Sequence, residues 1–359
     1  MNTHQKLLHL RNEDDWRSLL PASQSVFGSY EFARIQEQYS RRIASLFVFD
    51  DGRSRTVYSF FLRSLSELPF SQIAGANWDS ATPEFTAPFY LSGASAARFC
   101  DAVHQLFCEL GVVTEFMHLN PWSDAGQMLT GGELCFNREV VWVDTTLSED
   151  ELWQNHFSYA CRKNLKRAAN EDVRVFEATS LDEVRAFHRI YRGTMDRNQA
   201  LGSYYLPPEY FISIFEQMAG NARFVLAEYK GQIVAATLYM HDDVSVYSYF
   251  GGADYDYQHV RPTNAIVNYA IAWARRNGKQ RLVLGGGYQP DDGIFRFKAS
   301  FSHLRAAFYT FRRIHLVEHY NALQANWCTY HGTAPDNTYF PGYRSPAAVR
   351  SSSAIGADE

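Results

Sequence analysis

The stretch LGGGYQPDDGIFRFKASF, at residues 284–301, brings together residue types that can carry out chemistry. An apolar run ends at three consecutive glycines (285–287), an acidic turn follows, and the pair Phe297 and Lys298 comes next. Glycines placed directly after a strand let a ligand approach the backbone closely, so that their N–H groups can face an anion or an acyl oxygen. The spacing matches neither a dinucleotide fingerprint nor a P-loop.

The turn and the lysine predict a short helix with a cation at its side. Asp291 and Asp292 can cap this helix by accepting backbone N–H bonds. We expect Lys298 to lie near the end of the strand, where its ammonium group can stabilise negative charge on an acyl oxygen or a phosphate. An ordinary solvated lysine is the alternative. Asp292 and Tyr249 are candidate acceptors for a substrate proton, which water could also take.

A second basic segment, RKNLKRAA at 162–169, indicates a site for an anion. Its bases are spaced four residues apart on a predicted helix, so like charges share a face and repel unless an anion bridges them or water screens them. Arginine is well suited to bind phosphate through two parallel hydrogen bonds. The candidate diphosphate contacts are Arg162, Lys163, Arg167 and Arg197.

The charge of the chain is unevenly distributed. The net charge is −5, yet residues 160–315 hold 21 Lys+Arg against 15 Asp+Glu, while the rest of the chain holds 13 against 24. A basic region inside an acidic protein favours a local anionic ligand over a surface coated by nucleic acid. We therefore expect no DNA partner.

Cysteine content and the N-terminus bear on the compartment. The five cysteines form no CxxC pair, so we expect reduced thiols and neither a disulfide framework nor a bound metal. Neither a signal-peptide core nor a membrane-spanning apolar run is present in the sequence. These features predict a cytoplasmic protein, with a peripheral position at the inner membrane face left open.

Two arrangements of elements occur twice, which predicts an internal duplication. Hairpins are expected at 44–63 and 222–240, and helices that end at glycine and lead into strands are expected at 94–111 and 263–278. The hairpin-turn glycines lie 179 positions apart and the helix-end glycines 167 apart. The similarity of these two offsets predicts two copies of one α/β unit.

The duplication sets the predicted domains. We expect an N-terminal domain at 1–146 and a C-terminal domain at 147–345, followed by a disordered tail at 346–359. One linking helix is predicted over 148–170, beginning with a capping box formed by Ser148 and Glu151.

Several segments of the chain resemble the FemAB-like branch of the GNAT acyltransferases. The strongest are RKNLKRAANEDVRV, YRGTMDRNQALGSYYLPPEYFISIF, GGADYDYQHVRPTNAIVNYAIAWARRNG and LGGGYQPDDGIFRFKASF, with FPGYR at 340–344. The resemblance is strong over about 145–344 and weaker in the N-terminal half, where PFYLSG and EFMHLNPW carry it. It implies an α/β fold of tandem GNAT-like domains, each with a mixed, mainly antiparallel sheet flanked by helices.

The family resemblance also implies a reaction. Members transfer an acyl or aminoacyl group to an amine of a cell-envelope intermediate, and a Phe-Lys pair matching Phe297 and Lys298 lies at their transfer centre. This implies an acyl-CoA co-substrate without a tightly bound cofactor, and an acceptor such as an amino sugar on a nucleotide or lipid carrier. The implied substrate-binding residues are Gly285, Gly286, Gly287, Tyr204 and Asn264, besides the four bases above.

The sequence departs from the family in two respects: it lacks the coiled-coil arm of some Fem ligases, and YDYQHVRPTN at 255–264 only loosely resembles the usual pyrophosphate loop. Three functions follow. The first is an N-acyltransferase of surface-polysaccharide biosynthesis. The second is a Fem-type ligase that takes amino acids from aminoacyl-tRNA, which requires a basic footprint for the nucleic acid. The third is a non-catalytic subunit of envelope assembly.

Overall fold

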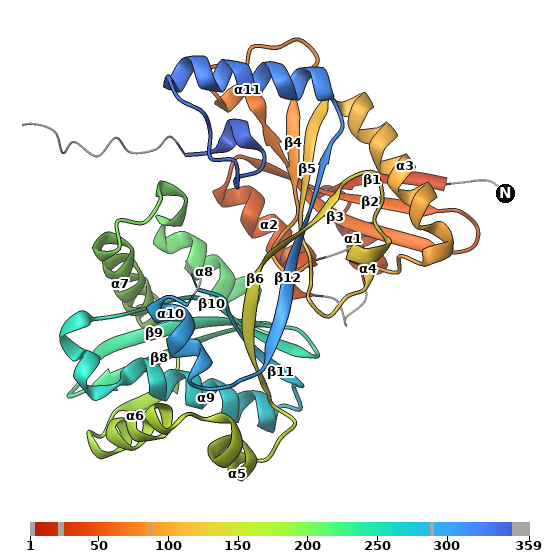
Figure 1. Cartoon of the computed structure of the whole chain (residues 1–359). Coiled ribbons are helices and arrows are strands. Elements are labelled where there is room, and N and C mark those ends of the chain that lie inside the picture. The colour runs from red at the N-terminus through yellow and green to blue at the C-terminus, as the bar shows by residue number, and fades with distance from the viewer. Residues whose placement is uncertain (1–3, 21–24, 87, 288–290, 347–359) are drawn as a thin grey trace, which may run out of the picture.

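The strands of the protein form one continuous sheet, seen in a computed structural model that describes residues 4–20, 25–86, 88–287 and 291–346 (Figure 1). The twelve strands follow the order β1-β2-β3-β4-β5-β12-β6-β11-β10-β9-β8-β7. Only two neighbouring pairs, β4 with β5 and β10 with β11, are parallel. The predicted α/β class with a mainly antiparallel sheet is therefore confirmed. The strand bounds are β1 His4–His9, β2 Arg42–Asp50, β3 Arg55–Ser64, β4 Trp78–Ala81, β5 Val112–His118, β6 Glu133–Asp144, β7 Arg174–Glu177, β8 Ala222–Tyr229, β9 Gln232–His241, β10 Ser245–Ala253, β11 Arg281–Gly285 and β12 Arg305–Ile314.

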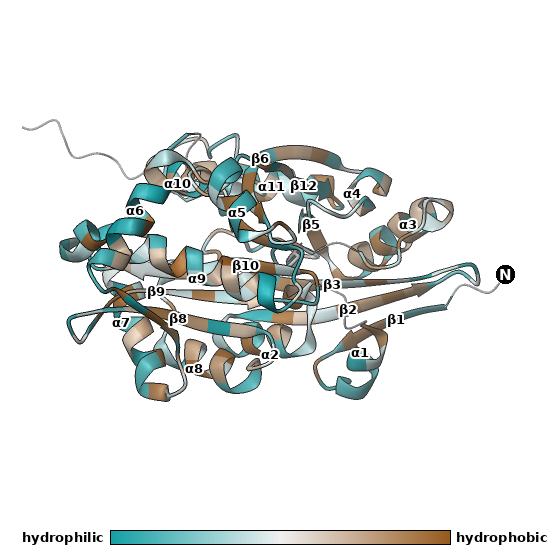
Figure 2. Ribbon diagram, turned by 90° about the horizontal axis from the view of Figure 1, so that it is seen from below, coloured by the Kyte–Doolittle hydropathy of each residue, from teal (hydrophilic) through white to brown (hydrophobic). Residues whose placement is uncertain are grey.

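Helices cover both faces of this sheet, as the view along its layers in Figure 2 shows. Four of them, α1, α2, α7 and α8, bury apolar side chains on one face. The helices α3, α4, α6, α9 and α10 cover the other face. The helix bounds are α1 Glu13–Leu19, α2 Tyr30–Tyr39, α3 Gly93–Leu110, α4 Ala125–Met128, α5 Glu149–Glu151, α6 Tyr159–Asn170, α7 Leu181–Arg197, α8 Pro208–Gln217, α9 Pro262–Arg276, α10 Gly293–Ala299 and α11 Val317–His331.

Both copies of the predicted duplication are present in the structure. The hairpins β2–β3 and β8–β9 are antiparallel ladders at the expected positions. The helices α3 and α9 are each followed by a glycine with positive φ, at Gly111 (74°) and Gly278 (65°), a conformation that glycine adopts at little cost. In each copy the helix connects two parallel strands, β4 to β5 and β10 to β11.

Two long strands join the copies by crossing between them (Figure 1). The strand β6 comes from the N-terminal part of the sequence but pairs with β11, and β12 comes from the C-terminal part but pairs with β5. The helix α11 also packs in the N-terminal half, where Leu323 and Trp327 share a core cluster with Val113. The division into domains at 146/147 remains a prediction, and the sheet is continuous across it.

The predicted single linking helix over 148–170 is wrong. Its capping box at Ser148 and Glu151 is present, but a π-helical turn (Leu152–His156) follows and the backbone becomes extended at Phe157. A second helix, α6, then starts from Ser158, whose hydroxyl accepts the Cys161 N–H at 3.1 Å. The Ser158 N–H donates to the Ser300 carbonyl at 2.8 Å, so a tertiary contact holds the break open.

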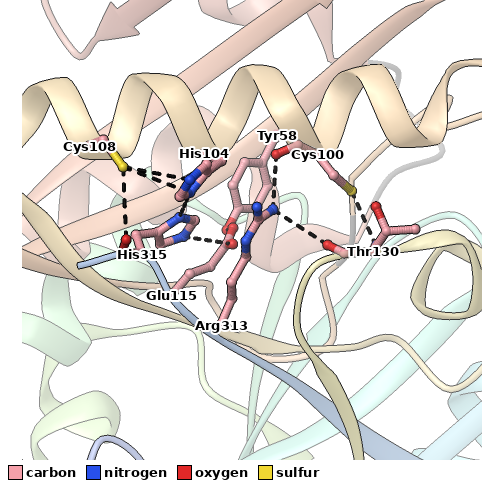
Figure 3. A network of polar contacts seen from close by, with 8 residues as sticks. All are labelled: Tyr58, Cys100, His104, Cys108, Glu115, Thr130, Arg313 and His315. Atoms are coloured by element: carbon pink, nitrogen blue, oxygen red, sulfur yellow. Dashed lines mark hydrogen bonds and ion pairs between the residues drawn. The ribbon is translucent and has the colours of Figure 1, made fainter. Parts of the chain in front are cut away.

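A buried polar network lies beneath α3 in the N-terminal half (Figure 3). The Glu115 carboxylate, 1% exposed, accepts hydrogen bonds from the Tyr58 hydroxyl at 2.8 Å and the His315 ring at 3.2 Å. The Nδ1 atoms of His315 and His104 lie 2.9 Å apart, so one ring donates and the other accepts. Burial raises the pKa of Tyr58 well above its usual range, which keeps its hydroxyl a donor. The network ties together β3, β5, α3 and the residue that follows β12.

Replacing Glu115 with alanine should destabilise the fold by several kcal/mol. The change leaves the Tyr58 hydroxyl and the His315 ring without their acceptor, and each buried unsatisfied group costs about 1–3 kcal/mol. Tyr58→Phe removes one hydrogen bond of the same network and should cost about 1 kcal/mol. Urea unfolding of both variants measures the difference. Equal stability losses would contradict this account of the network.

The tail is predicted at 346–359, and all of it except Pro346 lies outside the described residues. Within the described part of the chain, no helix has both the length and the apolar character needed to cross a membrane.

Candidate active site

The glycines after β11 take conformations that side chains would obstruct. Gly285 has φ +82°. A Cβ atom on Gly286 would lie 2.7 Å from the Cδ atom of Arg138 and 3.0 Å from the carbonyl oxygen of Glu139. The glycine run therefore lets the end of β11 turn while it passes close to β6. Gly287 accepts a hydrogen bond from Arg138 through its carbonyl oxygen, at 2.9 Å.

Lys298 lies against this turn, as the sequence predicts. Its Nζ atom donates to the carbonyl oxygen of Gly286 at 2.7 Å, and a Cβ on Gly285 would lie 3.3 Å from the same nitrogen. Burial lowers the pKa of Lys298 to about 8, with Arg138 acting in the same direction and Asp292 opposing both. The ammonium group has three donors, and the Gly286 carbonyl occupies one of them. A partly desolvated cation thus sits at the end of β11.

The short helix α10 holds the lysine in this position. Asp292 caps it by accepting the Phe295 N–H at 2.7 Å, as predicted. Phe297 packs edge-on against the buried Phe301, with ring centroids 5.5 Å apart. The carboxylate of Asp292 therefore has a structural role as a cap and also interacts electrostatically with Lys298.

The parallel strands beside the glycines separate before they reach the turn. β10 and β11 pair from Ser245 and Arg281 as far as Tyr247 and Val283. β10 then has an irregularity between Ser248 and Phe250 and continues along β9. Past Tyr247 the two parallel strands are no longer paired, so backbone groups of both become available where Gly285 begins.

Tyr249 is not brought together with Lys298. Its ring packs against Phe27, at a centroid distance of 5.2 Å, in the core cluster under α2 and α8. Phe297, next to Lys298, packs in the cluster on the opposite face of the sheet. Burial raises the pKa of Tyr249 well above its usual range, and Tyr210 and Glu84 add to the rise. A tyrosine held protonated in this way is a poor base, which does not favour Tyr249 as a proton acceptor; that role stays a prediction.

Tyr249 belongs instead to a polar group where the two halves meet, which we call the junction cluster: Gln36, Arg42, Glu84, His118, Tyr210 and Tyr249. The Gln36 amide lies 2.8 Å from the Tyr210 hydroxyl, and the two tyrosine hydroxyls lie 3.5 Å apart. Arg42 and Glu84 both act on the pKa of Tyr249. These residues come from α2, β2, the segment after β4, β5, α8 and β10.

The junction cluster holds a cation suited to bind an anion. The Arg42 guanidinium is partly buried, and among the described residues no hydrogen bond or ion pair engages it. Burial lowers the pKa of His118 to about 4; its contact with the Thr82 carbonyl opposes this, while Arg63, Arg42 and Arg138 add to the lowering. His118 is therefore neutral near pH 7. The positive charge at the junction is carried by arginine.

Glu84 provides the cluster with a carboxylate. Desolvation raises its pKa and Arg138 opposes the rise, although Glu84 as a whole residue is exposed to solvent. Arg138 also acts on the pKa of His118 and of Lys298. This arginine on β6 is therefore the electrostatic connection between the junction cluster and the glycine turn.

The bases predicted to bind a diphosphate are dispersed. Arg162 donates to the carbonyl oxygens of Trp153 and Phe157, so its side chain bridges α6 and the segment before the break in the linking helix. Lys163 and Arg167 are exposed on α6. Arg197 is exposed on α7 and donates to the Ala253 carbonyl at 3.1 Å. Their role as phosphate contacts remains a prediction, and Arg42 is a further candidate that sequence reasoning missed.

The last two predicted binding residues differ in exposure. Tyr204 lies in the 3-10 turn Gly202–Tyr204, 43% exposed. Asn264 is buried in the first turn of α9, and its side-chain nitrogen has no hydrogen-bond partner among the described residues. A buried amide without a partner is costly unless a ligand or water satisfies it, so Asn264 remains a candidate substrate-binding residue.

The residues that sequence reasoning missed carried only weak signals. Glu84 follows a strand and lies among prolines at 83 and 88, as a loop carboxylate often does. Arg42 begins a strand as the second residue of the basic pair Arg41-Arg42, and nothing local distinguishes it from a surface base. Over the described residues, no cluster of three or more His, Cys, Asp or Glu side chains is arranged to hold a metal ion.

Comparison with known proteins agrees with the fold. Residues 155–299 match the acetyltransferase (GNAT) domain family. A solved structure of FemX is similar, with a TM-score of 0.68, 12% identity, and coverage of 89% of this chain and 99% of that one. The C-terminal domain of a putative lysylphosphatidylglycerol synthetase from Agrobacterium fabrum gives a TM-score of 0.55, 13% identity, and coverage of 89% and 97%. The comparison with curated proteins found no match.

A third solved structure bears on the duplication. A tandem GNAT protein from the clavulanic acid biosynthesis pathway aligns with a TM-score of 0.50 and 8% identity, covering 88% of this chain and 99% of that chain. The match of residues 155–299 to the GNAT acetyltransferase domain supports an acyltransferase, and the predicted resemblance to the FemAB-like branch is confirmed.

Proposed function

We propose that the protein is an N-acyltransferase that moves an acyl group from acyl-CoA to an amino group of a cell-envelope precursor, a nucleotide- or lipid-linked amino sugar, in surface-polysaccharide biosynthesis. The observation that carries the proposal is the position of Lys298 against the Gly286 carbonyl, at the point where β10 and β11 separate. There an acyl group, its activating thioester and a cation can meet.

The donor would lie along the separated strands. Backbone N–H and C=O groups beyond Tyr247 and Val283 can bind an extended chain as a strand would. The carbonyl carbon of the donor would then reach the glycine turn. The tandem GNAT structure is described as one without AcCoA, which supports CoA as the donor of a similar fold.

The acceptor would bind at the junction cluster. Arg42 has no anionic partner among the described residues, and a phosphate or diphosphate of the carrier would supply one. Glu84 would receive the amino group, first by pairing with its ammonium form and then by accepting its proton. Desolvation raises the pKa of Glu84, which makes its carboxylate a better proton acceptor.

The reaction itself requires charge stabilisation at the carbonyl oxygen. Attack by the neutral amine forms the new C–N bond and places negative charge on this oxygen, which Lys298 and backbone N–H groups near Gly285 would stabilise. Collapse of the intermediate breaks the C–S bond, and the thiolate of CoA leaves and takes up a proton. One such donor is worth about 3–4 kcal/mol of the activation barrier.

A second candidate function is the transfer of an amino acid from aminoacyl-tRNA. The similarity to FemX and the exposed bases on α6 and α7, among them Lys163, Arg167 and Arg197, support it. The same site would perform the chemistry, because an aminoacyl ester is attacked by the acceptor amine in the same manner. The two candidates differ in the donor, and the exposed bases would then contact the tRNA backbone.

Donor binding and product mass separate these candidates. Acetyl-CoA should raise the midpoint of thermal unfolding, and incubation with mixed acyl-CoAs and UDP-linked amino sugars should yield an N-acylated sugar by mass spectrometry. Arg42→Ala should raise KM for the sugar nucleotide, and Arg11→Ala, at an exposed site near the N-terminus, serves as the control. A salt-sensitive gel shift with tRNA, combined with no response to any acyl-CoA, would favour the ligase.

A further inference from the structure

The N-terminal half contains a cavity of its own, away from Lys298. Its volume is about 250 Å³, and its walls come from the segment between β4 and α3 and from the segment that follows β5 and includes α4. Phe85, Leu91 and Met128 are among the apolar walls. Phe85 and Tyr90 have positive φ values of 50° and 58°, conformations that cost energy for residues with a side chain.

The cavity occupies the place that the duplication assigns to a ligand. In sheets with parallel strands, ligands bind beyond the carboxyl ends of those strands. β4 and β5 are the parallel pair of the N-terminal copy, as β10 and β11 are of the C-terminal copy. The segment after β5 therefore corresponds to the glycine turn and α10. The cavity is the counterpart of the region around Lys298.

The counterpart cannot perform the same chemistry. The sequence has no lysine between Lys6 and Lys163, so this half has no residue to take the place of Lys298. No lysine, arginine or histidine is among the residues that line the cavity. A phosphate or carboxylate ligand would find no cation there. The cavity is suited to binding an uncharged ligand without transfer.

The polar groups of the cavity indicate the class of that ligand. Tyr90, Asn120 and Asp124 line it. Within the described residues, no hydrogen bond or ion pair engages the Tyr90 hydroxyl, the Asn120 side-chain nitrogen or the Asp124 carboxylate. Together they offer donors and acceptors beside aromatic and aliphatic walls. A sugar ring presents hydroxyl groups that donate and accept, and C–H faces that pack on such walls.

We propose that this cavity is a second, non-catalytic site that binds one uncharged saccharide unit. The carboxylate of Asp124 accepts hydrogen bonds from two neighbouring hydroxyls of the sugar, and the amide of Asn120 donates to another. Phe85 contacts the apolar face of the ring. The inference concerns binding in the N-terminal half and does not depend on the proposed transfer reaction.

The test is direct titration of the full-length protein with N-acetylglucosamine, galactose and N,N′-diacetylchitobiose, followed by saturation-transfer NMR and calorimetry. We expect at least one of these sugars to bind saturably, with a Kd on the order of 1 mM. Asp124→Ala should weaken the binding roughly tenfold or more, because it removes a charged hydrogen-bond acceptor. Tyr90→Phe should weaken it by a smaller factor.

Two comparisons make the outcome decisive. Asp124 is exposed, so Asp124→Ala should unfold at the same temperature as the native protein, and Asp150→Ala on α5 should bind the sugars normally. Lys298→Met should bind them normally as well. Failure of all three sugars to bind saturably would overturn the proposal. Binding that survives Asp124→Ala and Tyr90→Phe but is lost in Arg42→Ala would overturn it too, since the sugar would then occupy the junction cluster.

Discussion

Lys298→Met should lower kcat by about 100- to 1,000-fold, the usual cost of removing one donor to an oxyanion. KM for the acyl donor should change little, because the ammonium group acts on charge that appears only in the transition state. The variant should also unfold at a temperature at least as high as the native protein. Burial lowers the pKa of Lys298 to about 8, so burying the charged ammonium group costs free energy in the folded state. Methionine carries no charge, so the substitution removes this cost.

The pH dependence of stability and of kcat provides a further test of the role of Lys298. The folded protein binds fewer protons than the unfolded chain between pH about 8 and the ordinary lysine range, so this group makes the fold more stable as pH rises through that window. If the charged form is the catalytic one, kcat should decline above about pH 8, and Lys298→Arg should retain activity at higher pH. Lys166→Met on the exposed face of α6 is the matched control. Steady-state rates of Lys298→Met equal to those of this control would refute the role.

Asp79→Ala should destabilise the protein by about 3–5 kcal/mol, the range observed when one partner of a buried ion pair is removed. Its carboxylate is 0% exposed and forms ion pairs with Arg63 and Arg344, whose side chains are 19% and 15% exposed. Removing the carboxylate leaves two desolvated guanidinium groups beside each other. Arg344 also donates to the Ser64 carbonyl at 2.9 Å, so the variant should loosen the C-terminal segment first.

The surface pair of Arg185 and Asp182 provides the comparison for Asp79. Asp182 is 92% exposed, and exposed ion pairs contribute about 0–1 kcal/mol. Asp182→Ala should therefore leave the urea midpoint almost unchanged, while Asp79→Ala lowers it strongly. Hydrogen exchange of residues 340–345 should rise in Asp79→Ala alone. If both variants unfold at the same urea concentration, the buried triad does not hold the C-terminal segment.

Local features of the sequence were sufficient to predict the glycine turn and its lysine. The chain from Gly285 to Lys298 is short, and the cap at Asp292 fixes the start of α10, so few arrangements are open to it. Hairpins and helix ends were predictable for the same reason. Turns and caps depend on residues that are adjacent in sequence.

The junction cluster could not be predicted because its members meet only in the folded sheet. Arg42, Glu84 and His118 lie on separate elements, and the order of the strands brings them together. The placement of Tyr249 depends on the irregularity of β10 at Ser248 and Phe250, which sets the face on which the ring lies. A shift of one residue in a strand moves a side chain to the other face, and periodicity alone does not reveal it.

The break in the linking helix could not be predicted from the sequence either, because it depends on one tertiary contact. Helical periodicity continues through Phe157 and Ser158, but the Ser158 N–H is used by the Ser300 carbonyl, which lies far along the chain. A continuous helix would use a local hydrogen bond from the Ser158 N–H, whereas the folded protein uses the tertiary bond to Ser300. Sequence patterns can predict the local bond but not the tertiary one.

The crossing of β6 and β12 has a consequence for synthesis of the protein on the ribosome. The N-terminal half needs β12 beside β5, and α11 over Val113, before its layers are complete. These elements come late in the sequence, so residues 4–118 emerge long before the chain that finishes their packing is available. Nascent chains that end at residue 146 should be captured by chaperones or cut by proteases, and the first half should become resistant only after residue 345 has left the exit tunnel.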